Sequence, residues 1–414
     1  MNPMLPITMK SLTRPPRALW AILVVGLVFR IAIIFFDNSL GLFAQVAIAP
    51  DFHARATVLA DAWRGGQFLT PMPDLAPEMS KHNEMRTLVA YLLAPFYVLL
   101  GDSPIAGRIA IATYATGLGY VTWLLAREIG LDTPWSLLAV AVTTFWPSVI
   151  YRSVVLMREI LVVVPVLIAI WIAVWWAESP TDMRRLAGGG MLLLVVARLL
   201  WALRPETLLI IGIAFVVATG VRYHEYTRAL AAVAVVGVVG VIGAVTQLGA
   251  FIGPRNDDGL SPATLDAYAH VRAHGGSAYL TWLHYDTWID VVLFAPLKVL
   301  YFLAAPMPWD VNSVIDLLAG MSGWLLLSVC LLAAYGAWRL FRAHPHSLPP
   351  SASVLVAFLT AGILAYSIIE MNGGAAFRRR IQFVPVIILL AVVGLSAVRR
   401  RLSTGNAPST TDIA

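Results

Sequence analysis

The sequence is poor in charged residues. Only 13% of its 414 residues are Asp, Glu, Lys or Arg, whereas 59% are hydrophobic. This balance excludes an ordinary soluble globular domain and is typical of polytopic membrane proteins. The formal net charge of +6 comes mostly from arginine. We attribute it to the orientation of loops in a membrane and expect no nucleic-acid partner.

Signatures of several other protein classes are missing. The one cysteine, Cys330, lies in an apolar run, so no intrachain disulfide can form. The turn at 275–277 is not followed by the lysine of a phosphate-binding loop. There is no internal repeat and no inverted pair of broken spans, which disfavours the common transporter folds. No Ser–His–Asp or Cys–His arrangement for nucleophilic catalysis is readable.

Apolar runs of about 20 residues recur along the whole chain, as membrane-spanning helices require. They predict an all-α polytopic membrane protein with about ten transmembrane helices. The first run has no small-residue cleavage site and is too long for a signal-peptide core, so we expect it to remain as a span. Short interfacial or re-entrant helices are expected at 42–49, 52–63, 86–101 and 291–305. The predicted spans are 18–36, 108–125, 135–150, 158–176, 186–203, 207–221, 229–250, 317–340, 353–369 and 381–398.

Positive charge sets the predicted orientation of these spans. Basic residues precede the first span and follow the last, which predicts that both termini are cytoplasmic. The expected location is the plasma (inner) membrane, which the chain crosses several times. Residues 1–398 are predicted to form one transmembrane domain, and 399–414 a disordered cytoplasmic tail. The two large outer loops of this domain are 37–85 and 251–290.

Ionisable residues within the spans are expected to have a partner or a function, because each costs at least about 2.5–3.5 kcal/mol in hydrocarbon. Most of them fall in the outer half of the membrane under the predicted topology. Arg30 is about 10 Å below the outer end of its helix, at a rise of about 1.5 Å per residue, which is too deep for snorkelling. The distribution predicts a polar cavity at head-group depth. The residues concerned are Arg30, Arg108, Arg158, Glu159, Arg198, Arg204, Glu206, Lys298 and Glu370.

A cavity rich in arginine suits a phosphate, because arginine binds phosphate with paired hydrogen bonds and keeps its charge when desolvated. The membrane-bound phosphate that we expect is a polyprenyl phosphate carrying a sugar. Transfer of the sugar needs a carboxylate to deprotonate or orient the acceptor hydroxyl. Asp51 and Glu159 are the candidates. Asp51 also suits a helix N-cap, and Glu159 also suits an ion pair with Arg158.

The motifs of the chain follow the order found in one class of membrane enzymes. An arginine near the end of the first span is followed by an acid before an aromatic residue and by an amphipathic helix. A Pro-to-Ser segment, a second acid and an Arg-Pro corner come later. The sequence resembles the GT-C class of membrane glycosyltransferases, including protein O-mannosyltransferases and lipid A aminoarabinose transferases. The residues that carry the resemblance are Arg30, Asp51–His53, Ala56, Leu59, Ala60, Gly65, Gly66, Pro95, Gly101, Ser103, Arg108, Arg158, Glu159, Arg204, Pro205, Asn372–Gly374 and Arg378–Arg380.

The resemblance implies a GT-C-like architecture and an inverting hexosyltransferase that uses a polyprenyl-phosphate sugar on the outer face. The acceptor would be a hydroxyl of a glycan, a lipid or a protein. Asp51 and Glu159 would be the catalytic residues. The donor phosphate would be bound by Arg30, Arg158, Arg204 and Arg378.

The first outer loop holds further titratable residues, which are secondary site candidates: His53, Glu78, His82 and Glu84. A divalent cation, Mg²⁺ or Mn²⁺, is left open as a cofactor, because Asp-x-His is no metal signature. Two other functions are kept as alternatives. One is an O-antigen or exopolysaccharide polymerase or ligase, for which the loop 251–290 would be central. The other is a transporter or lipid flippase, which the one-sided charge distribution disfavours.

Overall fold

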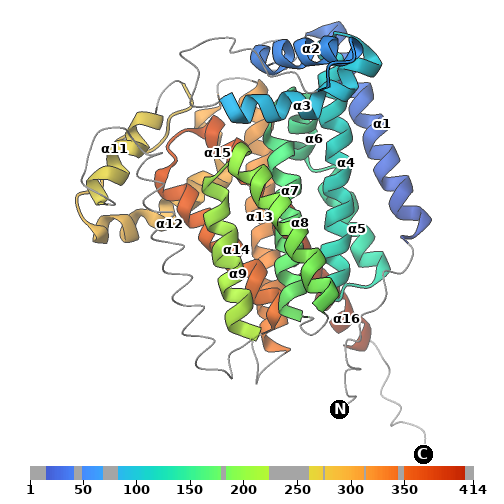
Figure 1. Cartoon of the computed structure of the whole chain (residues 1–414). Coiled ribbons are helices and arrows are strands. Elements are labelled where there is room, and N and C mark those ends of the chain that lie inside the picture. Colours follow the sequence, from blue (N-terminus) through green and yellow to red (C-terminus); the bar gives the residue numbers. More distant parts are fainter. Residues whose placement is uncertain are drawn as a thin grey trace, which may run out of the picture.

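The computed structural model describes residues 15–41, 49–68, 83–178, 183–222, 261–273, 276–311, 314–343 and 349–405, and within them the chain is helical and has no strand. Local sequence explains many helix starts. Ser103, Asp132, Ser261 and Asn372 each cap a helix with a side-chain oxygen. The helices (Figure 1) are α1 (Arg17–Leu40), α2 (Pro50–Arg64), α3 (Asn83–Leu100), α4 (Pro104–Glu128), α5 (Thr133–Thr144), α6 (Pro147–Val154), α7 (Glu159–Glu178), α8 (Met183–Leu203), α9 (Glu206–Arg222), α11 (Pro262–Arg272), α12 (Trp288–Ala304), the 3₁₀ turn η2 (Pro308–Asp310), α13 (Val314–Arg342), α14 (Pro350–Ile369), α15 (Gly373–Arg380) and α16 (Val384–Gly405).

The described part of the chain has five helices that are long and apolar enough to cross a membrane, or up to seven if each of two bent pairs is one span. This arrangement is compatible with a multi-pass membrane protein. Two shorter apolar helices lie within α8 and α9. The predicted span 229–250 lies outside the described residues. The five long candidates are α1, α4, Glu159–Ala177 of α7, Ala319–Arg342 of α13, and α14.

The observed helices differ from the predicted elements at two breaks in the backbone. The predicted span 135–150 is two helices, α5 and α6, bent by 53° at a break that precedes Pro147. Proline disfavours helical geometry in the residue before it and is well suited to begin a new helix. The interval 370–380 between two predicted spans contains the short helix α15, which is bent by 61° from α16. Helix α16 continues to Gly405, and residues 406–414 of the predicted tail lie outside the described residues.

One end of the bundle is basic. Helices α1 and α4 are antiparallel, because Trp20 stacks on Tyr120 at 5.9 Å, whereas Asp37 pairs with Arg108. The start of α1 therefore lies beside Arg127 at the end of α4. The guanidinium of Arg399 lies 5.8 Å from the ring of Trp135, which places the last turns of α16 near the start of α5. Helices α2 and α3 cross the opposite end of the bundle (Figure 1).

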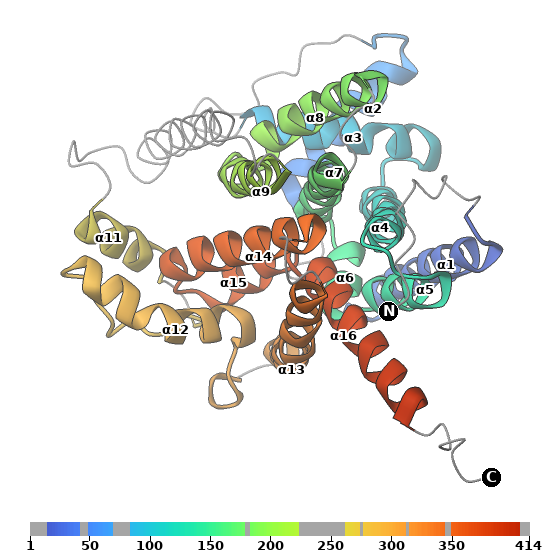
Figure 2. The ribbon, with the colours of Figure 1, turned by 90° about the horizontal axis from the view of Figure 1, so that it is seen from below.

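Helix α7 is central to the bundle, where it contacts α4, α9 and α14 (Figure 2). Its valine, leucine and isoleucine side chains belong to one continuous buried core. At the α2–α3 end, α7 begins at Glu159 directly beside the start of α2, because the Ala49 amide donates to the Leu156 carbonyl at 3.3 Å. The core therefore holds the first turn of α7 against the helices that cross this end.

Helices α13 and α16 approach each other at a pair of glycines. A β-carbon added at Gly336 would overlap the Leu390 carbonyl oxygen, and one at Gly394 would lie 2.5 Å from the Leu332 carbonyl oxygen. Small residues permit this close backbone approach, which stabilises helix pairs in membranes through van der Waals contact. The α13–α16 interface therefore depends on the absence of side chains at these two positions.

We expect Gly336→Ala to lower the stability by about 1–3 kcal/mol, because the added methyl group forces the two backbones apart. Gly212→Ala is the matched control: Gly212 is also in a helix, α9, but an added β-carbon there meets nothing within 4 Å. Thermal unfolding of both variants in detergent measures the difference. Equal melting temperatures for the two would contradict the close approach of α13 and α16.

Candidate functional site

A cavity of about 1150 Å³ lies toward the α2–α3 end of the described structure. Its volume exceeds the usual range for small-molecule pockets, about 300–1,000 Å³. Part of the lining, which we call the apolar wall, comes from α1, from α6 and from the residue Met157, and consists of Phe29, Ile33, Pro147, Ile150, Val154 and Met157. Further lining residues are of mixed polarity and come from 276–279, Ala305, Pro306, Trp309, Asp310, Asp316, Ala319, Asn372 and α15. The charged and amide side chains in the lining are Arg152, Asp310, Asp316, Asn372 and Arg378.

The break between α5 and α6 shapes the apolar wall. Helix α6 contributes Pro147, Ile150, Tyr151, Arg152 and Val154 to the lining. Arginines from other helices bind carbonyls at the ends of α5 and α6: Arg30 Nη2 donates to Thr144 O at 2.6 Å, and Arg108 Nε donates to Val154 O at 2.6 Å. Carbonyls at helix ends need such partners. The position of α6 is therefore fixed by buried side chains of α1 and α4.

Arg30 is buried at the edge of this arrangement and holds helices together. Besides Thr144, it donates from Nε to Ser153 Oγ at 2.7 Å and from Nη1 to Gly26 O at 2.8 Å. It is not among the residues that line the cavity. Its predicted role as a donor-phosphate ligand stays a prediction, and the contacts seen here are structural.

A cationic cluster adjoins the cavity. Arg152 lines it, and both Glu159 and Arg378 are near enough to Arg152 to interact with its charge. Arg158 interacts in the same way with Arg204, Glu159 and Arg378. We call Arg152, Arg158, Arg204, Arg378 and Glu159 the arginine cluster. It brings together four residues predicted from the sequence and adds Arg152.

The arginine cluster has more positive charge than it can pair. Burial, and next the charge of Arg204, lower the pKa of Arg158. Arg158 Nη1 donates to Leu203 O at 2.9 Å, and Arg204 Nε lies 3.8 Å from Glu206 Oε1, which is beyond hydrogen-bond distance. An anion bound among these groups would relieve their repulsion.

Buried polar atoms of the cluster also lack hydrogen-bond partners within the described residues. They are Nε of Arg152, Nε of Arg204 and Oε2 of Glu159. The Arg152 guanidinium lies 5.1 Å from the ring of Tyr151 and 4.9 Å from that of Phe377, so aromatic faces hold it in place. Unsatisfied buried donors are rare in proteins. An anionic group bound beside the two arginine donors would satisfy them, whereas the Glu159 oxygen would need a donor, such as a hydroxyl of the same ligand.

The three consecutive arginines of α15 have three different positions. Arg378 lines the cavity. Arg379 Nη1 lies 3.1 Å from Oε2 of Glu370, a residue with no exposed surface. Arg380 is buried and donates to the carbonyls of Leu303, Ala305 and Ala319. Only Arg378 of the three is therefore placed to meet a ligand in the cavity.

The predicted residues of the first outer loop do not line the cavity. Asp51 is half exposed in the first turn of α2, and its Oδ2 lies 3.2 Å from Nη1 of Arg86. His53 Nδ1 lies 3.0 Å from the Tyr97 hydroxyl. Glu84 pairs with Arg198 on exposed surfaces of α3 and α8. Glu78 and His82 lie outside the described residues.

Sequence reasoning missed the cavity residues Tyr151, Arg152, Asp310 and Asp316. The first two looked like the flank of an uninterrupted span, whereas Pro147 was the signal for a break. Asp310 and Asp316 lie between the predicted helix 291–305 and the predicted span 317–340, where no element was expected. Asn372, which also lines the cavity, is the N-cap of α15. Its side-chain oxygen accepts a hydrogen bond from the backbone amide of Ala375 at 3.1 Å.

The sequence matches no protein-family model and no curated protein. The cavity and its arginine cluster are therefore the basis for assigning a function.

Proposed function

We propose that the protein is an inverting membrane glycosyltransferase of the hexosyltransferase type. It would move a sugar from a polyprenyl-phosphate donor to an acceptor hydroxyl of a glycan, lipid or protein. The observation that carries the proposal is the amphipathic cavity, which has an apolar wall and adjoins the arginine cluster. A ligand with a lipid tail and a phosphate needs both features.

Exposed apolar residues of the lining offer a path for the lipid tail. Phe29 of α1 lines the cavity and is 44% exposed, and Trp309 lines it and is 71% exposed. Exposed apolar residues on a membrane protein contact lipid without cost. A polyprenyl chain could therefore extend from the cavity into the bilayer past these side chains. The phosphate would remain beside Arg152 and Arg378.

The reaction would place negative charge where the arginines are. The acceptor oxygen attacks the anomeric carbon, the bond from that carbon to the phosphate oxygen breaks, and a carboxylate takes the acceptor proton. The departing polyprenyl phosphate gains charge that Arg152, Arg158, Arg204 and Arg378 would stabilise. No co-reactant is needed, because the donor supplies the activated sugar. A divalent cation, Mg²⁺ or Mn²⁺, stays open.

Two carboxylates are proposed for catalysis. Glu159 lies within the arginine cluster, where it would orient the guanidinium groups and the sugar. Asp51 would be the general base that takes the proton of the acceptor hydroxyl. The hydrogen bond between Ala49 and Leu156 supports this, because it joins the start of α2 to the segment that leads into Arg158 and Glu159.

We further propose a GT-C-like architecture with about ten spans. The five long helices, the two bent pairs, α8, α9 and the predicted span 229–250 would make up this number. The basic end would face the cytoplasm, with both termini, in the plasma (inner) membrane. The cavity would then open on the outer side.

The test is transfer from a panel of labelled polyprenyl-phosphate hexoses by the purified full-length protein in lipid vesicles. We expect Asp51→Asn to lower turnover by about 10²–10⁴-fold, the usual contribution of a general base. Asp61→Asn is the control, because Asp61 is an exposed acid on the same helix that pairs with Arg64. Full activity in Asp51→Asn would remove Asp51 from the mechanism. If the wild-type protein turns over none of the donors, the proposal that it is a glycosyltransferase is wrong.

A polymerase or ligase of lipid-linked glycans is the second candidate. The observation that favours it is that residues 276–279, from the second outer loop, line the cavity beside Asn372. The chemistry at the phosphate is the same, and the acceptor is then itself a lipid-linked glycan. Products that lengthen stepwise in the vesicle assay would identify this activity.

A further inference from the structure

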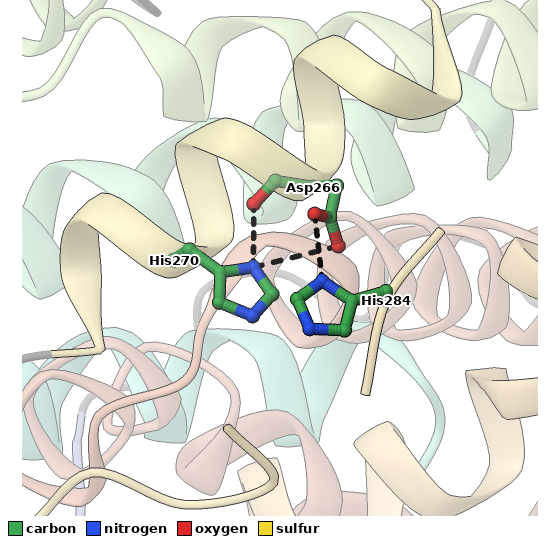
Figure 3. Close-up of side chains that lie close together, drawn as sticks. All are labelled: Asp266, His270 and His284. Atoms are coloured by element: carbon green, nitrogen blue, oxygen red, sulfur yellow. Dashed lines mark hydrogen bonds and ion pairs between the residues drawn. The ribbon is translucent and has the colours of Figure 1, made fainter. Parts of the chain in front are cut away.

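A cluster of two histidines and an aspartate lies away from the cavity, on α11 and the segment that follows it (Figure 3). Asp266 and His270 are four residues apart, so they share one face of the helix. His284 approaches them from the segment 276–287. The side chains of Asp266 and His270 are 21% and 27% exposed, and that of His284 is 58% exposed.

The distances in the cluster, measured to the two different oxygens of the Asp266 carboxylate, are close to those between ligands of a zinc ion. His270 Nδ1 lies 3.4 Å from Asp266 Oδ1, and His284 Nδ1 lies 3.1 Å from Asp266 Oδ2. Bonds of about 2.0–2.2 Å in a tetrahedron place neighbouring ligand atoms about 3.3–3.5 Å apart. The two imidazole rings are parallel, with centroids 4.4 Å apart, and both direct Nδ1 toward Asp266 (Figure 3).

The hydrogen bonds around His270 also suit a metal ligand. Its Nδ1 faces Asp266, whose backbone oxygen is 3.0 Å away, and its Nε2 lies 3.2 Å from the Thr281 carbonyl oxygen. A neutral imidazole has one donor and one acceptor, so it cannot satisfy oxygen atoms at both nitrogens. A cation at Nδ1 resolves this, because Nε2–H then donates to Thr281, as in most histidine ligands of metals.

The carboxylate of Asp266 is also held by a hydrogen bond from the segment that follows α11. Asp266 Oδ1 accepts a hydrogen bond from the Tyr285 amide at 2.9 Å. Carboxylate ligands are commonly oriented by such outer hydrogen bonds. Both residues of α11 are therefore held by the segment 281–285 in positions that a metal ion could use.

We propose that Asp266, His270 and His284 form a Zn²⁺ site with three protein ligands and a fourth position open to water. Two imidazole nitrogens and one carboxylate oxygen suit zinc better than the harder ions Mg²⁺ and Ca²⁺. The site joins α11 to the segment that supplies residues 276–279 to the cavity. Arg272, on the same helix, lies 3.6 Å from Glu370. The inference does not depend on the proposed glycosyl transfer.

The experiment measures metal binding by the full-length protein in detergent, carrying an affinity tag without histidine. After treatment with a chelator, the protein is titrated with Zn²⁺, and separately with Co²⁺, whose visible spectrum distinguishes four-coordinate from six-coordinate sites. We expect equimolar Zn²⁺, a four-coordinate Co²⁺ spectrum and a higher melting temperature with Zn²⁺. Because His284 is exposed, His284→Ala should fold normally and lose at least about 10-fold in Zn²⁺ affinity.

Two further variants keep the result interpretable. Asp266→Asn should lose Zn²⁺ binding as well. His53→Ala should retain it, because His53 lies on α2 beside Tyr97 and outside the cluster. Failure of the wild type to bind Zn²⁺, a six-coordinate Co²⁺ spectrum, or unchanged affinity in His284→Ala would overturn the proposal. The first outcome would mean that a proton, not a metal, occupies the space between the ring nitrogens and Asp266.

Discussion

Replacing Arg152 with methionine is expected to lower the rate of sugar transfer by about 10²–10³-fold, the usual loss when one donor to developing negative charge is removed. Arg152 is 6% exposed and lines the cavity, and its Nε has no hydrogen-bond partner within the described residues. Methionine keeps most of the volume between the rings of Tyr151 and Phe377 and removes the charge and the N–H donors of the guanidinium. The measurement is transfer from polyprenyl-phosphate hexose in vesicles.

Two comparisons separate this effect from a loss of folding. Arg152→Lys keeps a charge but loses paired hydrogen bonding, so we expect an intermediate rate. Arg198→Met removes an exposed arginine that pairs with Glu84, and it should leave the rate unchanged. Melting temperatures of all three variants should stay near that of the wild type. If Arg152→Met transfers sugar at the wild-type rate, the arginine cluster does not bind the leaving phosphate.

Replacing Asp37 with alanine is expected to have the largest effect on stability, a loss of about 3–5 kcal/mol, because it leaves a buried arginine uncompensated. Arg108 Nη2 donates to Asp37 Oδ2 at 2.6 Å, and the two residues are 3% and 2% exposed. The pair joins α1 to α4, and Arg108 also binds the Val154 carbonyl of α6. Thermal unfolding in detergent measures the loss.

The double variant Asp37→Leu with Arg108→Met is the control for this prediction. Replacing both members of a buried ion pair by apolar residues of similar size is often neutral or stabilising. We expect the double variant to recover most of the stability lost in Asp37→Ala. A double variant less stable than the single one would show that the bond to Val154, rather than the charge pair, dominates.

Much of the fold could be predicted from the sequence because membrane spans and amphipathic helices leave a periodic apolar signal. The helix predicted at 52–63 lies within α2, and the segment predicted at 86–101 is helical up to Leu100, the last residue of α3. Two predicted neighbours, Arg158 and Arg204, do lie close together. We predicted that both arginines belong to one site because each is an ionisable residue beside a span. Such a residue needs a partner, which the fold must supply.

The remaining features depend on backbone breaks and distant contacts, which a single sequence does not reveal. The run 135–150 is apolar throughout, so its hydropathy hides the break before Pro147 that places Arg152 at the cavity. Arg30 was predicted to bind the donor phosphate because it lies deep in its span. Its partners, Thr144 and Ser153, are more than 100 positions away in sequence, and no local pattern indicates them.

The three arginines of helix α15 fix the number of residues between Asn372 and Arg378. Successive residues of an α-helix differ by about 100° in direction, so its three arginines can reach the cavity, Glu370 and the carbonyls near Ala305 only in one register. Inserting a single residue between Asn372 and Arg378 would rotate all three charges away from their partners, although the composition would hardly change. This segment should therefore tolerate exchanges of its exposed side chains far better than any insertion or deletion.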